Sequence, residues 1–150
     1  MVGHEGGRIL VTGALGQIGT DLVQSLRDIY GSETVIASDI REKQDHPCIV
    51  NGPYTNLDVL DKDKIFKLIV EKEIKIIYHL AAILSARCEE NPDLCEMINV
   101  EGTRNILEAA REFNLRIFSP SSIAVFGPDT PKKAPQITPL NPTTKYGMTK

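Results

Sequence analysis

The chain has 150 residues, of which 41% are hydrophobic and 25% are charged, and its formal net charge is −3. This length is enough for one domain with a full hydrophobic core. The charges are scattered rather than gathered in a basic stripe, which argues against nucleic acid as a partner. No apolar run approaches the ~20 residues that span a bilayer, so we expect no membrane partner either.

The first third of the chain predicts two strands around one helix. Residues 8–12 (RILVT) are a short apolar run that ends at a glycine, as a buried parallel strand does. Within residues 16–30, apolar positions recur at steps of three and four, which predicts a helix whose buried stripe is Ile18, Leu22, Leu26 and Ile29. Residues 34–38 predict a second strand that ends on Asp39, and the polar stretch 41–51 predicts a loop.

The middle of the chain continues this alternation. A weak third strand is expected before Asp58, and Asp61 is the expected N-cap of a helix whose inner face is Ile65, Phe66, Ile69 and Val70. Residues 74–79 (IKIIYH) predict a fourth strand. Pro92 suits the first turn of a long helix, and residues 115–118 predict a fifth strand.

The last part of the chain is mostly loop. Residues 119–141 hold five prolines, and Asn141 followed by Pro142 predicts the N-cap and first position of a final helix. Strands that alternate with helices of this length predict an α/β fold with a parallel sheet and right-handed crossovers. With no internal repeat and no linker, residues 1–150 are expected to form one domain.

The cysteine pattern favours reduced thiols. Cys48, Cys88 and Cys95 are odd in number, none belongs to a CxxC pair, and no histidine lies at ligand spacing. We therefore expect no metal site and no disulfide framework, as in a cytosolic-type compartment. The start of the chain has no apolar signal and no presequence rich in arginine and serine, which favours the cytoplasm or a mature form, with the mitochondrial matrix as the alternative compartment.

A glycine-rich loop joins the first predicted strand to the first helix. Its sequence, residues 13–19 (GALGQIG), has the spacing with which glycines permit a tight turn, close approach to a pyrophosphate and close helix packing. Asp39 ends the second strand, where an acid binds the ribose 2′-hydroxyl and repels a 2′-phosphate, so NAD is expected rather than NADP. Arg41 leaves NADP open, because a nearby arginine can accept that phosphate. For the glycines alone, an ordinary strand-to-helix turn is the alternative.

Tyr146 and Lys150 are four residues apart, so they lie on one face of a helix. A tyrosine hydroxyl is ordinarily too weak an acid to serve as a base at neutral pH, but a fixed ammonium stabilises its phenolate. Such a tyrosine can take a hydroxyl proton while hydride leaves the same carbon. The serines of residues 119–122 follow the fifth strand and could hold the substrate oxygen. For Tyr146 and Lys150 the alternative is an ordinary pair on the surface of a helix. For the serines it is a polar turn between strand and loop.

Several strings, in order along the whole chain, resemble the extended short-chain dehydrogenase/reductases: residues 13–19, Asp39, residues 57–59 (LDV), 79–82 (HLAA) and 99–103 (NVEGT), and Ser122 with Tyr146 and Lys150. Sugar-nucleotide epimerases and dehydratases share these strings. The strings NGP (51–53), ILSA (83–86) and PSSIAVFGP (120–128) narrow the resemblance to NAD-dependent L-threonine 3-dehydrogenases. That family oxidises the β-hydroxyl of L-threonine to 2-amino-3-oxobutanoate.

The resemblance implies a Rossmann-type, doubly wound parallel sheet with helices on both faces, and it implies a role for each matching residue. The pyrophosphate would be held by Gly13, Gly16, Gln17 and Ile18. The adenosine ribose would be bound by Asp39 and Ile40, the adenine flanked by Asp58 and Val59, and the path to the nicotinamide lined by Leu80, Ala81 and Ala82. Ser85 would bind the amino acid, Ser122 would orient its hydroxyl, Tyr146 would be the base, and Lys150 would tune it and hold the nicotinamide ribose. Asn99 would support the proton relay or, equally, stabilise helix packing.

Members of that family continue beyond the lysine. We therefore expect the C-terminal strands and the substrate lobe to lie outside residues 1–150, and little turnover from these residues alone. A homodimer is expected for the complete enzyme by the same resemblance. The alternatives are a nucleotide-sugar epimerase or dehydratase and a truncated, non-catalytic NAD-binding module.

Overall fold

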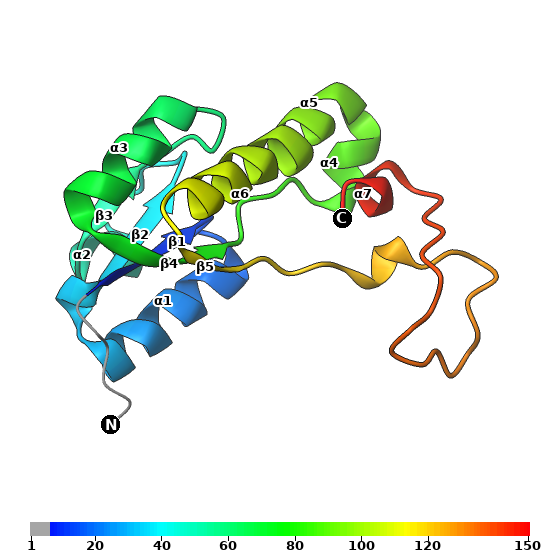
Figure 1. Cartoon of the computed structure of the whole chain (residues 1–150), viewed down its shortest axis with the longest axis horizontal. Coiled ribbons are helices and arrows are strands. Elements are labelled where there is room, and N and C mark those ends of the chain that lie inside the picture. The colour runs from blue at the N-terminus through cyan, green and yellow to red at the C-terminus, as the bar shows by residue number, and fades with distance from the viewer. Residues whose placement is uncertain (1–6) are drawn as a thin grey trace.

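The computed structural model describes residues 7–150 and contains a five-stranded parallel sheet (Figure 1). The strands lie in the order β3-β2-β1-β4-β5. Their bounds are β1 Arg8–Thr12, β2 Val35–Asp39, β3 Tyr54–Asn56, β4 Ile74–His79 and β5 Arg116–Phe118. All four neighbouring pairs are parallel. The five predicted strands and the parallel α/β fold are therefore confirmed.

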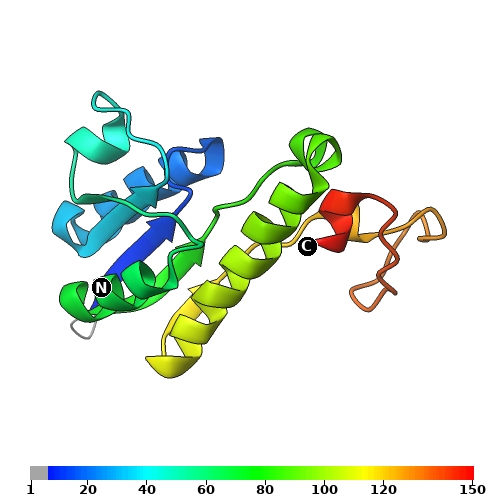
Figure 2. The ribbon, with the colours of Figure 1, turned by 90° about the horizontal axis from the view of Figure 1, so that it is seen from above.

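Helices cover both faces of this sheet. Figure 1 places α1 on one face and α3 and α6 on the other, and Figure 2 shows α5 and α6 as parts of one long rod joined through a π-helical turn. The helices are α1 Gln17–Tyr30, α2 Pro47–Val50, α3 Lys62–Lys72, α4 Ser85–Glu90, α5 Pro92–Glu96, the π-helix Met97–Gly102, α6 Thr103–Glu112 and α7 Lys145–Met148. Two 3₁₀ turns, Ser32–Thr34 and Ile123–Val125, complete the elements.

Two hydrophobic clusters, one on each face, hold the helices to the sheet. Successive side chains of a strand point to opposite faces, so β1 contributes to both clusters. Leu10 packs with residues of α3 and α6, including Ile65 and Ile106. Ile9 and Val11 pack with α1 and α2. Burial on both faces explains why the inner strands β1 and β2 read as nearly continuous apolar runs.

The predicted stripe of α1 is wrong in detail. Ile18 and Ile29 are 68% and 69% exposed, whereas Val23 and Arg27 are buried beside Leu26. The helix is turned by its contact with the glycine loop. The same displacement occurs in α3, where Leu68 is buried and Val70 is exposed.

Three short elements depart from the predicted loops and caps. The predicted loop 41–51 contains α2, whose first helical residue is Pro47, and α4 lies in a segment for which no helix was predicted. The last helix begins after Thr144, whose hydroxyl accepts the Gly147 N–H, rather than after Asn141. Four to six residues are too few for a hydrophobic period to show.

The prediction of reduced thiols is wrong for two of the three cysteines. Cys88 of α4 and Cys95 of α5 form a disulfide, and Cys48 is free and buried. The turn at Asn91 and Pro92 folds α5 back toward α4, which brings the two Cα atoms to 4.9 Å. This distance lies in the range that disulfides require. Counting cysteines and searching for CxxC pairs misses a bridge between two short helices.

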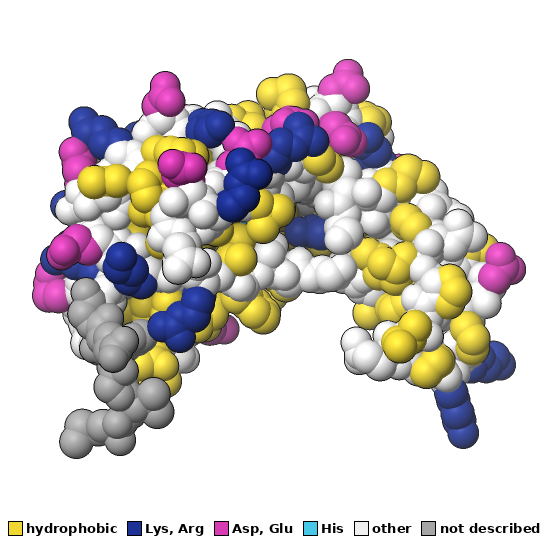
Figure 3. Space-filling model, viewed as in Figure 1, with side chains coloured by type: hydrophobic (Ala, Val, Ile, Leu, Met, Phe, Trp, Pro, Cys, Tyr) yellow, Lys and Arg dark blue, Asp and Glu magenta, His cyan; other side chains and the backbone are white. Residues whose placement is uncertain are grey.

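Residues 119–144 leave the sheet as an extended segment and return to place α7 beside α4 (Figure 1). Hydrophobic side chains gather on this projecting part of the surface (Figure 3). Ile123, Ile137 and Leu140 are among the most exposed, at 87%, 92% and 63%.

Among residues 7–150, no helix combines the length and the hydropathy that a membrane crossing needs.

Arg27 is a buried charged residue on which the α1 face depends. Its guanidinium donates to the carbonyl oxygens of Val35, Cys48 and Pro53, at 3.3, 3.0 and 2.8 Å. It therefore joins α1 to β2, to α2 and to the approach to β3. Desolvation on burial lowers its pKa, but these carbonyls satisfy its N–H groups.

We predict that Arg27→Leu lowers the free energy of unfolding by about 2 to 4 kcal/mol, because buried carbonyls lose their donor. Urea denaturation measures the change. Arg27→Lys is the matched control. It keeps the positive charge but loses the planar guanidinium with its several N–H groups, so a smaller loss of unfolding free energy is expected. Equal stability of Arg27→Leu and the parent protein would contradict this account.

Candidate functional site

The glycine loop follows β1 at the carboxyl edge of the sheet. Gly13 has φ = 68°, and a Cβ atom there would lie 2.7 Å from the Ala81 nitrogen and 2.8 Å from the Leu80 carbonyl carbon. Only glycine fits this left-handed turn against another backbone. The loop therefore lies directly beside Leu80 and Ala81, two residues of the predicted nicotinamide path. Leu80, Ala81 and the adjoining Ala82 are all half-buried.

The other two glycines of the loop differ in what they face. A Cβ at Gly19 would lie 2.3 Å from the Gly13 carbonyl oxygen, so Gly19 permits α1 to pack on the turn. A Cβ at Gly16 would meet only that same oxygen, at 3.2 Å. No side chain caps the start of α1, and Gln17 and Ile18 are exposed. An open, uncapped helix start with these glycines fits a pyrophosphate.

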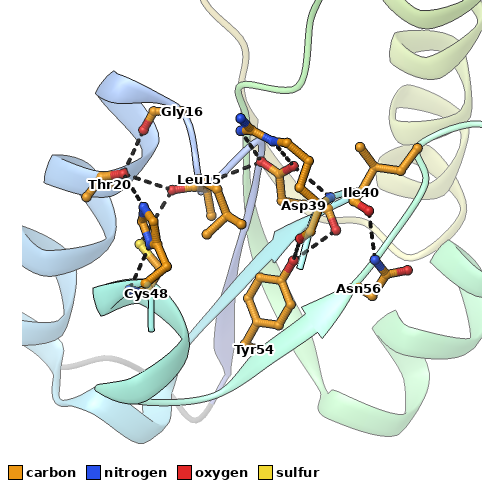
Figure 4. A network of polar contacts seen from close by, with 11 residues as sticks. Leu15, Gly16, Thr20, Asp39, Ile40, Cys48, Tyr54 and Asn56 are labelled. Carbon is orange, nitrogen blue, oxygen red and sulfur yellow. Dashed lines mark hydrogen bonds and ion pairs between the residues drawn. The ribbon is translucent and has the colours of Figure 1, made fainter. Parts of the chain in front are cut away.

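Asp39 lies at the centre of a polar network beside the loop (Figure 4). The carboxylate is buried and accepts the Leu15 N–H at 3.1 Å, while Arg41 donates to it from Nε at 2.9 Å and Nη2 at 3.1 Å. Burial opposes ionisation, but the hydrogen bonds from Arg41 and Leu15 outweigh it and hold the pKa of Asp39 below its usual value. Asp39 is therefore an ionised acceptor tied to the loop.

The segment after Asp39 is held by two side chains from β3. The Tyr54 hydroxyl donates to the Arg41 carbonyl oxygen and lies 3.1 Å from the Asp39 carbonyl oxygen, and Asn56 donates to the Ile40 carbonyl oxygen at 2.9 Å. Burial, followed by the Asp39 charge, raises the pKa of Tyr54 to about 12. Ile40 is exposed at this edge. Tyr54 and Asn56 were not predicted as site residues.

A second support for the loop comes from α2. Cys48 Sγ lies 3.4 Å from the Ala14 carbonyl oxygen, and Thr20 donates to the Gly16 carbonyl oxygen at 2.8 Å (Figure 4). His46 Nε2 lies 3.4 Å from the Thr20 hydroxyl, and His46 Nδ1 accepts the Cys48 N–H. The His46-Pro47 pair is the sequence signal that could have indicated this helix start.

The predicted adenine-flanking residues follow β3. Asn56 pairs in register with Asp39, so Asp58 and Val59 come directly after the same edge of the sheet. Asp58 Oδ1 accepts the Leu60 N–H at 3.0 Å. Val59 is buried, and a Cβ at Gly102 would lie 2.6 Å from its Cγ2 atom. Val59 thus packs on the π-helical turn, and its role toward adenine stays a prediction.

His79, at the end of β4, connects the sheet to the long helix. Its Nδ1 atom lies 2.8 Å from the Thr12 hydroxyl, and its Nε2 atom lies 3.1 Å from the Thr103 hydroxyl. Burial, followed by the positive charge of Lys150, lowers the pKa of His79 to about 4. The ring is therefore neutral at pH 7.

Tyr146 lies in α7, whereas Lys150 follows the helix, which ends at Met148, so the two residues do not share one helical face as predicted. The Lys150 ammonium is 5.8 Å from the centroid of the Tyr146 ring, so the structure brings the two residues together. Burial lowers the pKa of Lys150. The carboxylate of Glu89 accepts the Lys145 N–H at 2.9 Å, which fixes the start of α7 against α4.

Ser122 and Ser85 stand on the two elements that flank α7. Ser122 Oγ accepts the Ala124 N–H at 3.2 Å and so starts the turn Ile123–Val125. A Cβ at Gly147 would lie 2.2 Å from the Ala124 carbonyl oxygen, so this turn packs directly on α7. Ser85 is exposed at the first position of α4. Both serine roles stay predictions.

Asn99 has the structural role that the sequence left open, and its part in a proton relay stays a prediction. It is buried in the π-helical turn, and its Oδ1 atom accepts the Ile83 N–H at 2.7 Å. Its Nδ2 atom donates to the Ile83 carbonyl oxygen at 3.1 Å and to the Thr149 hydroxyl at 3.0 Å. Asn99 therefore joins the loop after β4 to the end of α7.

The model of the NAD dependent epimerase/dehydratase family matches residues 9–150. The chain belongs to this family. Over 144 residues it is 50% identical to uncharacterized epimerase/dehydratases of Staphylococcus aureus, and the match covers 95% of this chain and 45% of theirs. The chain thus spans a little under half the length of these relatives.

Two solved L-threonine dehydrogenases are similar to the chain across 94 to 95% of its length and 45% of theirs. The enzyme from Clostridium difficile is 44% identical with a TM-score of 0.92. A monomeric L-threonine 3-dehydrogenase from a metagenome is 49% identical with a TM-score of 0.88. A UDP-glucose 4-epimerase from Brucella ovis in complex with NAD has a TM-score of 0.84 at 23% identity, which shows the shared fold.

We predict that acid destabilises the fold through His79. Between pH 6.5 and about 4 the unfolded chain binds a proton at this residue that the folded chain does not, so stability falls as the pH falls through that window. The difference corresponds to up to about 3 kcal/mol. Urea denaturation from pH 7 to 4 measures it. His79→Gln, which cannot titrate, is expected to flatten the dependence, and an unchanged slope in this variant would contradict the assignment.

Proposed function

We propose that the chain is part of an NAD-dependent oxidoreductase that converts L-threonine to 2-amino-3-oxobutanoate. The observation that carries the proposal is the Lys150 ammonium 5.8 Å from the centroid of the Tyr146 ring, at the same sheet edge as a glycine cradle and an acid. Solved L-threonine dehydrogenases with 44% and 49% identity share this fold, which supports L-threonine as the substrate.

The cofactor would bind along the edge formed by β1, β2 and β4. The open start of α1 would receive the pyrophosphate at Gly16, Gln17 and Ile18. Asp39 would accept a hydrogen bond from the adenosine ribose, and its buried negative charge favours NAD over NADP. For that, the Arg41 side chain that now covers the carboxylate has to turn away. Bound NAD supplies the hydride acceptor.

The protein's own part in the reaction would be to orient the substrate and move one proton. Ser122 would hold the threonine hydroxyl, since its own hydroxyl hydrogen stays available when its oxygen caps Ala124. Tyr146 would remove the hydroxyl proton, with the Lys150 ammonium beside its ring. Ser85 would contact the amino acid from the start of α4.

The preferred partner is thus a small amino acid. A homodimer of the whole protein, in the cytoplasm, belongs to the same proposal, and the monomeric relative at 49% identity makes the oligomeric state a separate measurement. Size-exclusion chromatography with light scattering decides it.

We predict that the whole protein reduces NAD when L-threonine is added and that Tyr146→Phe lowers kcat by about 10² to 10⁴, because the general base is lost. NADH absorbance follows the reaction. Tyr78→Phe is the matched control, since it removes the same hydroxyl but keeps the ring contact with Phe118 on β5. A protein that ignores threonine and turns over a nucleotide sugar would instead be an epimerase or dehydratase. NAD binding with neither activity would indicate a non-catalytic binding module.

We also predict that Asp39→Ser weakens NAD binding about tenfold and strengthens NADP binding, because the repulsion of a 2′-phosphate is removed and Arg41 is freed to pair with it. Calorimetric titration with both cofactors measures this. Adding Arg41→Ala to Asp39→Ser is expected to abolish the gain for NADP. Unchanged preference in Asp39→Ser would exclude Asp39 as the ribose acceptor.

A further inference from the structure

The disulfide between Cys88 and Cys95 lies next to the catalytic end of the site. Both cysteines are fully buried. Cys88 Sγ is 3.5 Å from the Ile83 carbonyl oxygen, in the loop after β4, and Cys95 Sγ is 3.8 Å from the Thr149 hydroxyl, next to Lys150. The bridge therefore touches both segments that Asn99 joins.

The Asn99 amide has two hydrogens and four neighbours that could accept them. The Thr149 hydroxyl at 3.0 Å and the Ile83 carbonyl oxygen at 3.1 Å are closer than the two sulfurs, at 3.5 and 3.6 Å. The two hydrogens thus go to the two oxygens. A disulfide sulfur carries no hydrogen, so neither sulfur competes for these oxygens while the bridge is intact.

Reduction changes this arrangement in two ways. Each thiol gains a hydrogen, and the oxygen acceptors nearest to Cys88 and Cys95 are those that Asn99 already uses, on Ile83 and Thr149. In addition, bonded sulfurs are ~2 Å apart, whereas non-bonded atoms of this kind need roughly 3.5 to 4 Å. In a close-packed and fully buried site, the two thiols can separate to this distance only if the surrounding groups move.

We propose that Cys88 and Cys95 form a reversible oxidation site that controls how firmly α7 and the loop after β4 are held. The disulfide leaves both oxygens to Asn99, and the dithiol weakens these hydrogen bonds. A small dithiol reductant breaks the Sγ–Sγ bond with two electrons and two protons, giving two thiols, while the reductant closes into its own disulfide. Oxidation by a small disulfide is the reverse exchange.

The reagent would reach the sulfurs by local opening. The helices that cover the bridge, α4 with six residues and α7 with four, are too short to be stable without packing. Short elements of this kind open without global unfolding. The same opening displaces Lys150, which follows α7, so bound cofactor would oppose it. This last step rests on the proposed function, in which Lys150 holds the nicotinamide ribose.

Thermodynamic linkage makes the proposal quantitative. If reduction weakens NAD binding by some factor, saturating NAD shifts the thiol–disulfide equilibrium toward the disulfide by the same factor. We expect a factor of about five, the size of one neutral hydrogen bond.

The first experiment alkylates the thiols of the whole protein in denaturant, after purification without reductant, and maps the modified cysteines by peptide mass. Cys48 is expected to be modified at once, whereas Cys88 and Cys95 are expected to be modified only after treatment with dithiothreitol. Modification of Cys88 and Cys95 before reduction would overturn the proposal. This measurement does not depend on NAD or threonine, so it separates the proposal from the proposed function.

The second experiment measures NAD affinity by calorimetry in oxidised and in reduced dithiothreitol, and the dithiothreitol midpoint with and without saturating NAD. The NAD affinity is expected to be about fivefold lower in the reduced protein. The ratio of reduced to oxidised dithiothreitol at the midpoint is expected to be about fivefold higher with saturating NAD. The double variant Cys88→Ala with Cys95→Ala is the matched control, and its affinity should be the same in both buffers. A bridge that only stabilises the fold would lower Tm on reduction and leave NAD affinity unchanged, which would overturn the proposal.

Hydrogen exchange gives a readout without any ligand. Amides of residues 80–84 and 144–149 are expected to exchange faster in the reduced protein than in the oxidised protein. Equal exchange in the two states would overturn the proposal even if NAD does not bind. Threonine turnover that is indifferent to redox state would overturn it and leave the proposed function intact.

Discussion

Gly13 leaves β1 with φ = 68° and passes so close to the Ala81 nitrogen that a Cβ atom would lie 2.7 Å from it. This approach brings the chain after β1 beside the chain after β4. Gly19 then lets α1 pack on the same turn, and Leu15 donates to Asp39 at the end of β2. Three strand ends are thereby fixed relative to one uncapped helix start. A side chain at Gly13 would push against the backbone of Leu80 and Ala81.

The two ends of the site are built in different ways. The cradle rests on strands and on α1, whose apolar faces are buried in two hydrophobic clusters. The Tyr146 end rests on helices of four to six residues that bury little apolar surface of their own. It is held by polar contacts, such as the Glu89 carboxylate at the start of α7 and the Asn99 amide at its end. Its geometry therefore depends on individual side chains, whereas the cradle depends on the fold.

This difference explains how much could be predicted from the sequence. All five strands can be predicted from the pattern of hydrophobic residues, and so can the three long helical segments α1, α3 and the rod from α5 to α6. Caps help, such as Asp61, whose side chain accepts the Lys64 N–H. Asp39 was placed at its strand end for the same reason. Period fails for α2, α4 and α7, because four to six residues do not complete two turns. The stripe of α1 was misassigned because the glycine loop, a tertiary contact, sets the rotation of that helix.

The residues that sequence reasoning missed share one property: each acts through a backbone group far away in the chain. Arg27 reaches the carbonyl oxygens of Cys48, in α2, and of Pro53, after it, and Tyr54 reaches that of Asp39. The bridge between Cys88 and Cys95 differs, since it joins two side chains seven residues apart, but it also depends on a turn, at Asn91, that the local pattern does not show. Local pattern carries no information about such contacts.

Asn99 shows why a π-helical turn is useful at this position. An extra residue per turn rotates the residues that follow, so a helix can point one polar side chain inward without giving up the apolar face that α6 buries with Ile106 and Ala109. Asn99 is placed there between two segments that strands and clusters do not hold, Ile83 and Thr149. One amide holds them most firmly when no other donor shares the same oxygens. In the oxidation site proposed above, the state of the two sulfurs thereby acts on the geometry of the Tyr146 end.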